Sequence, residues 1–288
     1  MLFDALAAEM HRLLRNRLTV FWSVVFVPLM FAVGGVIYHL VNKAQGDAAA
    51  AAAGLPTTGA GAPLNLADFF AFGANQSANG ALMTFMLIAA ATVYAGDYRW
   101  ETWRLISARN TRPALILGKV GAMKLLALAA SLAMLVAAFV FYLAQAVVFE
   151  RPPTFSLGAA EAADAALIWL LSFVRLVQYG LVALLTAVVT RSLLAALFVP
   201  WALGFGQTIL GAPPVMMLLK LHPDGWPAQL LMPGLAYDTL KNLVSPGAAR
   251  VMSTEAALWP ALGSLALWCV VPLGLALLLF RRQDLSKE

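Results

Sequence analysis

The chain has 288 residues, of which 62% are hydrophobic and only 11% are charged, and its mean hydropathy is +0.82. Soluble domains are about 45–50% apolar and about 25% charged, so this composition excludes an ordinary soluble protein and indicates a polytopic membrane protein. The formal net charge is +5. The cations flank long apolar segments, as membrane topology requires, so we expect membrane lipid and no nucleic acid as a partner.

The first predicted element is an amphipathic helix over residues 1–17. Phe3, Leu6, Met10 and Leu13 recur at spacings of three and four, and charged residues occupy the positions between them. This pattern is typical of a helix that lies on a membrane surface. We therefore expect an interfacial helix before the first membrane span.

Six apolar segments follow, and each can supply the roughly 20 helical residues that cross a bilayer. The run Ala48–Ala53 has low complexity and is expected to belong to an external loop. Residues 212–257 contain turn clusters between short apolar stretches, which predicts an extracytoplasmic cap of short helices. The predicted fold is a single all-α membrane domain over residues 1–288, with spans at about 18–41, 77–95, 120–148, 165–189, 193–211 and 258–280.

Lysine and arginine residues flank the predicted inner ends of the spans far more often than the outer ends. This bias sets the orientation of a membrane protein, because cytoplasmic loops carry the excess of cations. An even number of spans places both termini on the same side. We therefore expect both termini in the cytoplasm.

A polar segment interrupts the apolar sequence between the second and third spans, from Gly96 to Lys119. Its tryptophans recur at helical spacing, and Glu101 and Arg104 form an i, i+3 pair, which predicts a short helix. With tryptophans in the interface and cations toward water, a helix over 97–112 is expected at the membrane surface. The alternative is an ordinary cytoplasmic loop that its positive charge keeps inside.

The order Thr102-Trp103-Arg104, then Arg112, then Leu117-Gly118-Lys119 resembles the signature of ABC-2-type transporter permeases. In that family the segment between the second and third spans carries a T-x-R…R…GK-like pattern and docks on an ATPase subunit. This chain departs from the pattern at Glu101, where relatives often have Gly, and at Pro113, directly after the second arginine. The resemblance implies an N-terminal elbow helix, a coupling helix over 97–112, and a location in the bacterial cytoplasmic membrane.

The same resemblance implies the partners and the residues that contact them. The expected partners are two ABC ATPase subunits, which hold ATP and Mg²⁺, and a second permease copy in a homodimer or related heterodimer. The residues assigned to ATPase coupling are Asp97, Trp100, Glu101, Thr102, Arg104, Arg109, Arg112, Lys119 and Arg191.

No catalytic motif is evident, so we expect no enzyme activity, cofactor or metal in this chain. Gly118-Lys119 is followed by Val120 and lacks the first glycine of a phosphate-binding loop. The sequence contains no H-E-x-x-H and no G-x-S-x-G. The three histidines are scattered along the chain.

One arginine, Arg175, lies inside a predicted span, about ten residues or about 15 Å from its outer end and so close to the bilayer midplane. An arginine that faces lipid there costs at least ~2.5 kcal/mol, so it should face protein or a wet cavity. Gln178 shares its helix face, and Gln207 of the fifth span can complete a polar strip along a transport path. The alternative is a structural arginine satisfied by helix-end carbonyls or by Glu150 or Glu161.

Two function classes remain open. The first is a permease subunit of an ATP-driven exporter that moves a hydrophobic, amphipathic or anionic cargo, such as a drug, an antimicrobial peptide or a lipid-like molecule. The alternative is a stand-alone secondary carrier or channel, whose ion coupling needs acidic residues near the midplane. None of the fourteen Asp and Glu residues falls there, which favours the first class. The sequence does not identify the cargo.

Overall fold

The computed structural model describes residues 2–53, 61–99, 110–245 and 255–283. Within these ranges the chain is predominantly helical, and six helices are long and apolar enough to cross a membrane. This confirms the predicted all-α class and is the architecture of a multi-pass membrane protein. The six helical segments are Arg17–Ala52, Gly80–Arg99, Arg112–Val148, Ala159–Thr190, Leu193–Leu210 and Leu258–Arg282.

The first spanning segment contains a wide turn. It is built from α2 (Arg17–Val20), the π-helix η1 (Phe21–Phe26) and α3 (Val27–Ala52). Pro28 has no amide hydrogen and its ring crowds the carbonyl one turn earlier, so a π-helical turn accommodates it. The run Ala48–Ala53, expected in an external loop, is not irregular, because α3 is helical through Ala52; alanine is the best helix former.

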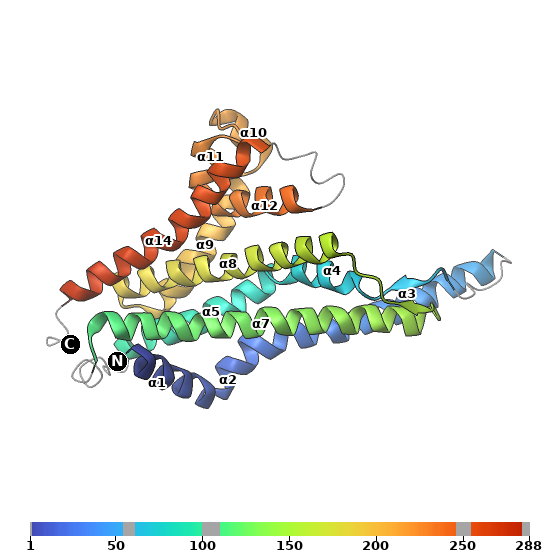
Figure 1. Cartoon of the computed structure of the whole chain (residues 1–288), viewed down its shortest axis with the longest axis horizontal. Coiled ribbons are helices and arrows are strands. Elements are labelled where there is room, and N and C mark those ends of the chain that lie inside the picture. The colour runs from blue at the N-terminus through green and yellow to red at the C-terminus, as the bar shows by residue number, and fades with distance from the viewer. Residues whose placement is uncertain (1, 54–60, 100–109, 246–254, 284–288) are drawn as a thin grey trace.

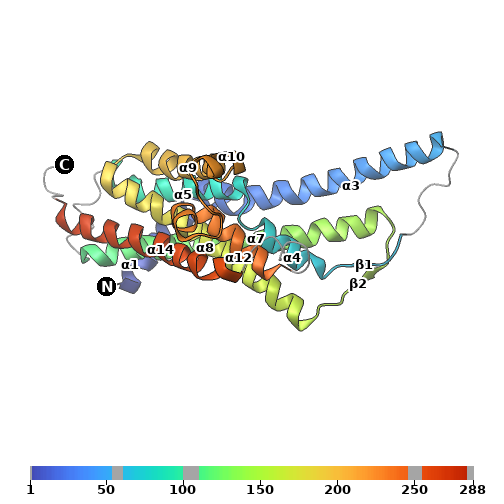
Figure 2. The ribbon, with the colours of Figure 1, turned by 90° about the horizontal axis from the view of Figure 1, so that it is seen from above.

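Beyond the far end of α3, the chain returns through two short elements, a strand and then a helix. Strand β1 (Leu64–Asn65) pairs in parallel with β2 (Pro153–Thr154), and α4 (Asp68–Gln76) packs against α7 (Arg112–Val148). Gly73 permits this contact, because a Cβ there would lie 2.9 Å from the Ala138 Cβ. Figure 2 shows α3, α7 and the two strands extending together to this end of the molecule.

The centre of the bundle is formed by α5 (Gly80–Arg99), α7 and α8 (Ala159–Thr190). Each contributes fully buried side chains to one continuous hydrophobic cluster, such as Leu82, Ile116 and Leu184. Helix α8 also contacts α9 (Leu193–Leu210) and α14 (Leu258–Arg282). Its position between these helices makes α8 the central helix of one half of the bundle.

Three segments that are distant in the sequence meet at the other end of the molecule. Figure 1 shows the N-terminal helix α1 (Leu2–Arg15), the start of α7 and the C-terminal end of α14 at this end. Hydrogen bonds from Arg12 to Asp97 and from Tyr98 to Gln283 place the end of α5 there as well. The end of α5 and the start of α7, the two helices that precede and follow residues 100–109 in the sequence, therefore lie at this end.

The segment between α9 and α14 folds back onto the bundle. It contains α10 (Pro213–Leu218), α11 (Trp226–Leu231), α12 (Pro233–Val244) and the short 3-10 helix η2 (Glu255–Ala257). The Tyr237 hydroxyl lies 2.8 Å from the Ser172 hydroxyl of α8, and Trp268 of α14 donates to the Leu230 carbonyl. Helices α11 and α12 thus pack beside the spans rather than only above them.

Helix α1 is held against α7 by a close contact at Gly118. A Cβ there would lie 3.0 Å from the backbone carbonyl carbon of Ala5, and backbone cannot move away as a flexible side chain can. We expect Gly118→Leu to destabilise the protein by about 1–3 kcal/mol, the usual cost of overpacking, measured from the midpoint of thermal unfolding in detergent. The matched control is Gly274→Leu in α14, because nothing lies within 4 Å of that position. Equal effects of the two substitutions would contradict this explanation.

Candidate functional site

Four charged side chains from three helices form an ion cluster at the end of the bundle where α1 lies. Asp97 of α5 is fully buried; its Oδ2 lies 2.6 Å from Nζ of Lys119, and its Oδ1 accepts from Nη2 of Arg12 at 2.7 Å. Glu9 of α1 accepts from Nη1 of Arg12 at 3.1 Å and from Nζ of Lys119 at 3.3 Å. Lys119 also donates to the Val93 carbonyl at 2.9 Å.

The ion cluster is balanced in charge and rich in hydrogen bonds. Buried charges are tolerated when they are paired and their remaining donors and acceptors are satisfied. The hydrogen bonds to Asp97 raise the pKa of the Arg12 guanidinium, which stays charged. Because Asp97 and Lys119 are at most 1% exposed, they hold α1, α5 and α7 together rather than present a surface to another protein.

A second set of contacts joins four helix ends, and we call it the C-terminal latch: Tyr98, Arg112, Val188 and Gln283. Nη1 of Arg112 donates to the carbonyls of residues 280, 281 and 283 at 3.3, 2.9 and 2.6 Å. The Tyr98 hydroxyl donates to Oε1 of Gln283 at 2.9 Å, and Nε2 of Gln283 donates to the Val188 carbonyl at 2.6 Å. The latch therefore ties α5, α7 and α8 to the end of α14.

The structure places the other predicted coupling residues as follows. Helix α5 continues to Arg99 and α7 begins at Arg112, so residues 97–99 belong to α5 and not to a separate surface helix. Arg191 is exposed in a left-handed conformation, φ 55°, at the C-terminal cap of α8. The remaining predicted positions lie outside the described residues: Trp100, Glu101, Thr102, Arg104 and Arg109.

A pocket of about 220 Å³ opens between α5, α8 and α9, and we call it the Arg175 pocket. Arg175 lies near the middle of α8, and of the described residues that line the pocket it is the one that carries a charge. The rings of Trp201 and Phe205 stack at 5.9 Å on the α9 side. The pocket is lined by Gly80, Met83, Thr84, Leu87, Arg175, Tyr179, Trp201, Gly204, Phe205 and Thr208.

Arg175 finds its partners on α12. Its guanidinium lies 4.4 Å from the centre of the Tyr237 ring, and Nη1 lies 3.6 Å from Oδ1 of Asp238. The two acids considered from the sequence have other roles. Glu150 pairs with Lys43 at 3.0 Å, and Glu161 accepts from the Gly158 amide at the start of α8.

The two glutamines of the predicted polar strip diverge. Oε1 of Gln207 accepts from the Gly234 amide at 2.6 Å, and a Cβ on Gly234 would lie 3.7 Å from Nη2 of Arg175. Arg175 and Gln207 therefore converge on the start of α12. Gln178 is buried on another side of α8 and donates to the Leu265 carbonyl of α14 at 3.1 Å.

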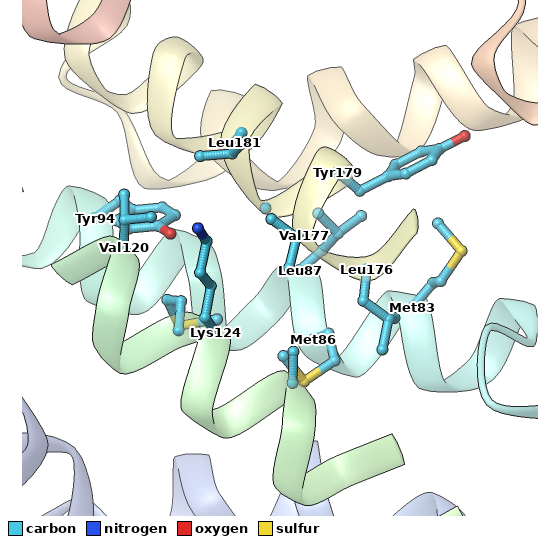
Figure 3. Close-up of a pocket in the computed structure, with 13 residues that line it drawn as sticks. Met83, Met86, Leu87, Tyr94, Val120, Lys124, Leu176, Val177, Tyr179 and Leu181 are labelled. Carbon is cyan, nitrogen blue, oxygen red and sulfur yellow. The ribbon is translucent and has the colours of Figure 1, made fainter. Parts of the chain in front are cut away.

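A second pocket lies deeper, between α5, α7 and α8. Figure 3 shows Lys124 extending from α7 toward Tyr94 of α5, with Met83 and Met86 below. Its volume is about 20 Å³, and a water needs at least about 10–15 Å³. This pocket has room for a water molecule and not for a larger ligand.

Comparison with protein-family models, with curated proteins and with solved structures finds no match to this chain. Across the part of the chain that the structure describes, no group of three or more His, Cys, Asp or Glu residues is placed to hold a metal ion. Functional inference therefore depends on the ion cluster, the C-terminal latch and the Arg175 pocket.

Proposed function

We propose that this chain is the permease subunit of an ABC-2-type, ATP-driven exporter. It would lie in the bacterial cytoplasmic membrane with both termini in the cytoplasm, together with a second permease copy. Two separate ATPase subunits would bind ATP and Mg²⁺, and the cargo would be hydrophobic, amphipathic or anionic. The six apolar helices and the spacing from Thr102 to Lys119 support this proposal.

The observation that carries the proposal is the attachment of both ends of segment 100–109. On one side, Asp97 and Tyr98 of α5 bond to α1 and to Gln283. On the other side, Arg112 and Lys119 of α7 bond to the end of α14 and to α1. A movement imposed on this segment would therefore pass directly to four helices, as rigid-body motion driven by a partner requires.

The distribution of acidic residues supports an external energy source over ion coupling. In the described ranges, no Asp or Glu lies in the middle of a spanning helix, whereas intramembrane acids are the usual proton relays of carriers. Buried Asp97 lies near the end of α5, and buried Glu9 lies in α1, which is not one of the six spanning helices; both are paired with cations. A stand-alone carrier or channel therefore has less support than an ATPase-driven permease.

The decisive test is purification of the tagged chain from its native membrane. We expect it to bring down an ATPase with a phosphate-binding loop, in a complex of two permease and two ATPase chains. Glu101→Ala or Arg104→Ala should reduce recovery of the ATPase at least tenfold, because truncation of one partner of a buried charge pair costs about 2–5 kcal/mol. Lys43→Ala, in the exposed ion pair near the far end of α3, is the matched control and should leave recovery unchanged.

Two outcomes would count against the proposal. If no ATPase is recovered with the unmodified chain under mild detergent, the chain is not such a permease. If the ATPase is recovered and both variants bind it and transport normally, the segment over 97–112 is an ordinary positive loop. Membrane insertion of each variant is checked first by its recovery in the membrane fraction.

A further inference from the structure

The Arg175 pocket contains donors that the protein itself leaves without acceptors. Nε of Arg175 and Nε2 of Gln207 are buried and have no hydrogen-bond partner, and the whole Gln207 residue is only 8% exposed, so water does not readily replace the missing acceptor. A buried donor without an acceptor is unfavourable, more so when it is charged. Arg175 lines the pocket and Gln207 lies beside it, and both side chains interact with the Tyr179 hydroxyl, so an acceptor that enters the pocket would satisfy the donors that Tyr179 leaves open.

The chemistry of the donors indicates an anion. A guanidinium presents a planar fork of N–H groups that matches the oxygens of a carboxylate or a phosphate. The hydroxyl groups of Thr84 and Thr208 donate to backbone carbonyls of their own helices, so Arg175 is the donor at the pocket wall that an anion would use. Of the described side chains that line the pocket, none is acidic, and the carboxylate that approaches Arg175 is that of Asp238, from α12.

The existing partner of Arg175 can be displaced. Asp238 contacts it at 3.6 Å, and the Asp238 side chain is 61% exposed. Ion pairs with an exposed partner contribute little, because water screens them. A ligand anion in the pocket would replace this carboxylate, which can then return to water.

The rest of the pocket is apolar and leads outward along α9. Met83 and Leu87 form one wall, and the stacked rings of Trp201 and Phe205 form the other. These two rings are 49% and 59% exposed, so they continue the wall onto the surface of a membrane-spanning helix. At about 220 Å³ the pocket is smaller than the roughly 300–1,000 Å³ that encloses a drug-sized molecule. It fits a head group and the beginning of a chain, with the remainder in lipid.

We propose that the Arg175 pocket binds the carboxylate or phosphate head of a single-chain anionic amphiphile, with its chain along Trp201 and Phe205. Asp238 acts as an internal competitor that occupies Arg175 when the pocket is empty. If the exporter function proposed above holds, this amphiphile is also the transported cargo, and that assignment rests on the proposed function. The binding site itself does not depend on that function.

The test uses the full chain in nanodiscs of zwitterionic phosphatidylcholine, without any ATPase. The probe is 11-(dansylamino)undecanoate, and energy transfer from tryptophan to dansyl reports binding. Dodecyl phosphate should displace the probe, and dodecanol should be at least tenfold weaker. Inorganic phosphate should not displace it at millimolar concentration, which separates an amphiphile from a free anion.

Three variants distinguish binding from a structural role of Arg175. Arg175→Gln should weaken binding about tenfold or more, because hydrogen bonds to charged groups are lost. Asp238→Asn removes an exposed group and should tighten binding about two- to fivefold, which a merely structural arginine does not predict. Lys124→Gln removes a cation of α7 at the neighbouring small pocket and should leave binding unchanged.

Several results would overturn the proposal. Equal displacement of the probe by dodecanol would indicate an apolar groove only. Displacement by inorganic phosphate would indicate a site for a soluble anion. Unchanged or weaker binding in Asp238→Asn would contradict the role of Asp238 as a competitor. If the chain does not bind the probe but an ATPase is recovered with it, the proposed exporter function is retained and the binding site is rejected. Binding here with no ATPase partner would reject the exporter and retain the site.

Discussion

Replacing Asp97 with leucine is expected to destabilise the protein by about 3–5 kcal/mol, because one partner of a buried ion pair is removed and the other charge remains. Lys119, which is 1% exposed and whose Nζ lies 2.6 Å from the Asp97 carboxylate, would then share Glu9 with Arg12, so the buried cluster would carry an excess positive charge. The unfolding of the purified protein by a denaturing detergent, followed by circular dichroism, measures this loss. A small effect would show that water reaches Lys119 in the native state.

A double variant separates two effects of the substitution: the excess positive charge that it leaves in the buried cluster, and the loss of the Asp97–Lys119 ion pair. Asp97→Leu combined with Lys119→Met replaces both charges by apolar side chains, an exchange that is often neutral or stabilising. We therefore expect the double variant to be more stable than Asp97→Leu alone. The matched control is Glu150→Gln, because the Lys43–Glu150 pair is exposed and such pairs contribute only about 0–1 kcal/mol. A double variant less stable than the single would contradict this account.

Replacing Arg112 with alanine is expected to open the end of α14. Its guanidinium donates to three backbone carbonyls there, and a hydrogen bond to a charged group contributes about 1.5–3 kcal/mol. The bonds share one nitrogen and are not additive, so we expect a total loss of about 2–3 kcal/mol, carried mainly by local opening. Hydrogen exchange of the amides of residues 276–282 should accelerate roughly 30- to 150-fold, by the same free energy.

Two further variants test the geometry of this contact. Arg112→Lys keeps the charge but loses the fork of donors, so it should recover only part of the protection. Arg281→Ala removes a neighbouring exposed cation and should leave the exchange rates unchanged. Equal acceleration in Arg281→Ala and Arg112→Ala would mean that charge near the helix end, and not the hydrogen bonds, stabilises α14.

The spans were predictable because membrane crossing depends on the length of an apolar run, which a sequence displays directly. Their ends were less predictable. Helix α7 begins at Arg112, well before the predicted start of its span at residue 120, because Pro113 favours the first helical turn and the helix continues beyond its apolar part. Hydropathy indicates whether a segment prefers lipid or water, whereas the ends of a helix depend on backbone hydrogen bonding.

The sites were predictable only in part. A charge in mid-span must be satisfied, so Arg175 could be singled out, but Tyr237 and Asp238 approach it only because α12 folds back beside α8. Asp97 and Lys119 were evident as charges, whereas their partners on α1 were not. The predicted apolar face runs through Phe3, Leu6, Met10 and Leu13, whereas the face that α1 buries carries Ala5, Glu9 and Leu13, so the sequence pattern did not mark Glu9.

The C-terminal latch also sets an order of events during biosynthesis. Arg112 is separated by 168 residues from the first carbonyl that it binds on α14, and Tyr98 by 185 residues from Gln283. Until α14 has been translated and inserted, the start of α7 and the ends of α5 and α8 lack these contacts. The bundle therefore closes late, and a nascent chain that stalls before α14 presents an open set of helix ends to the cell's membrane quality-control proteases.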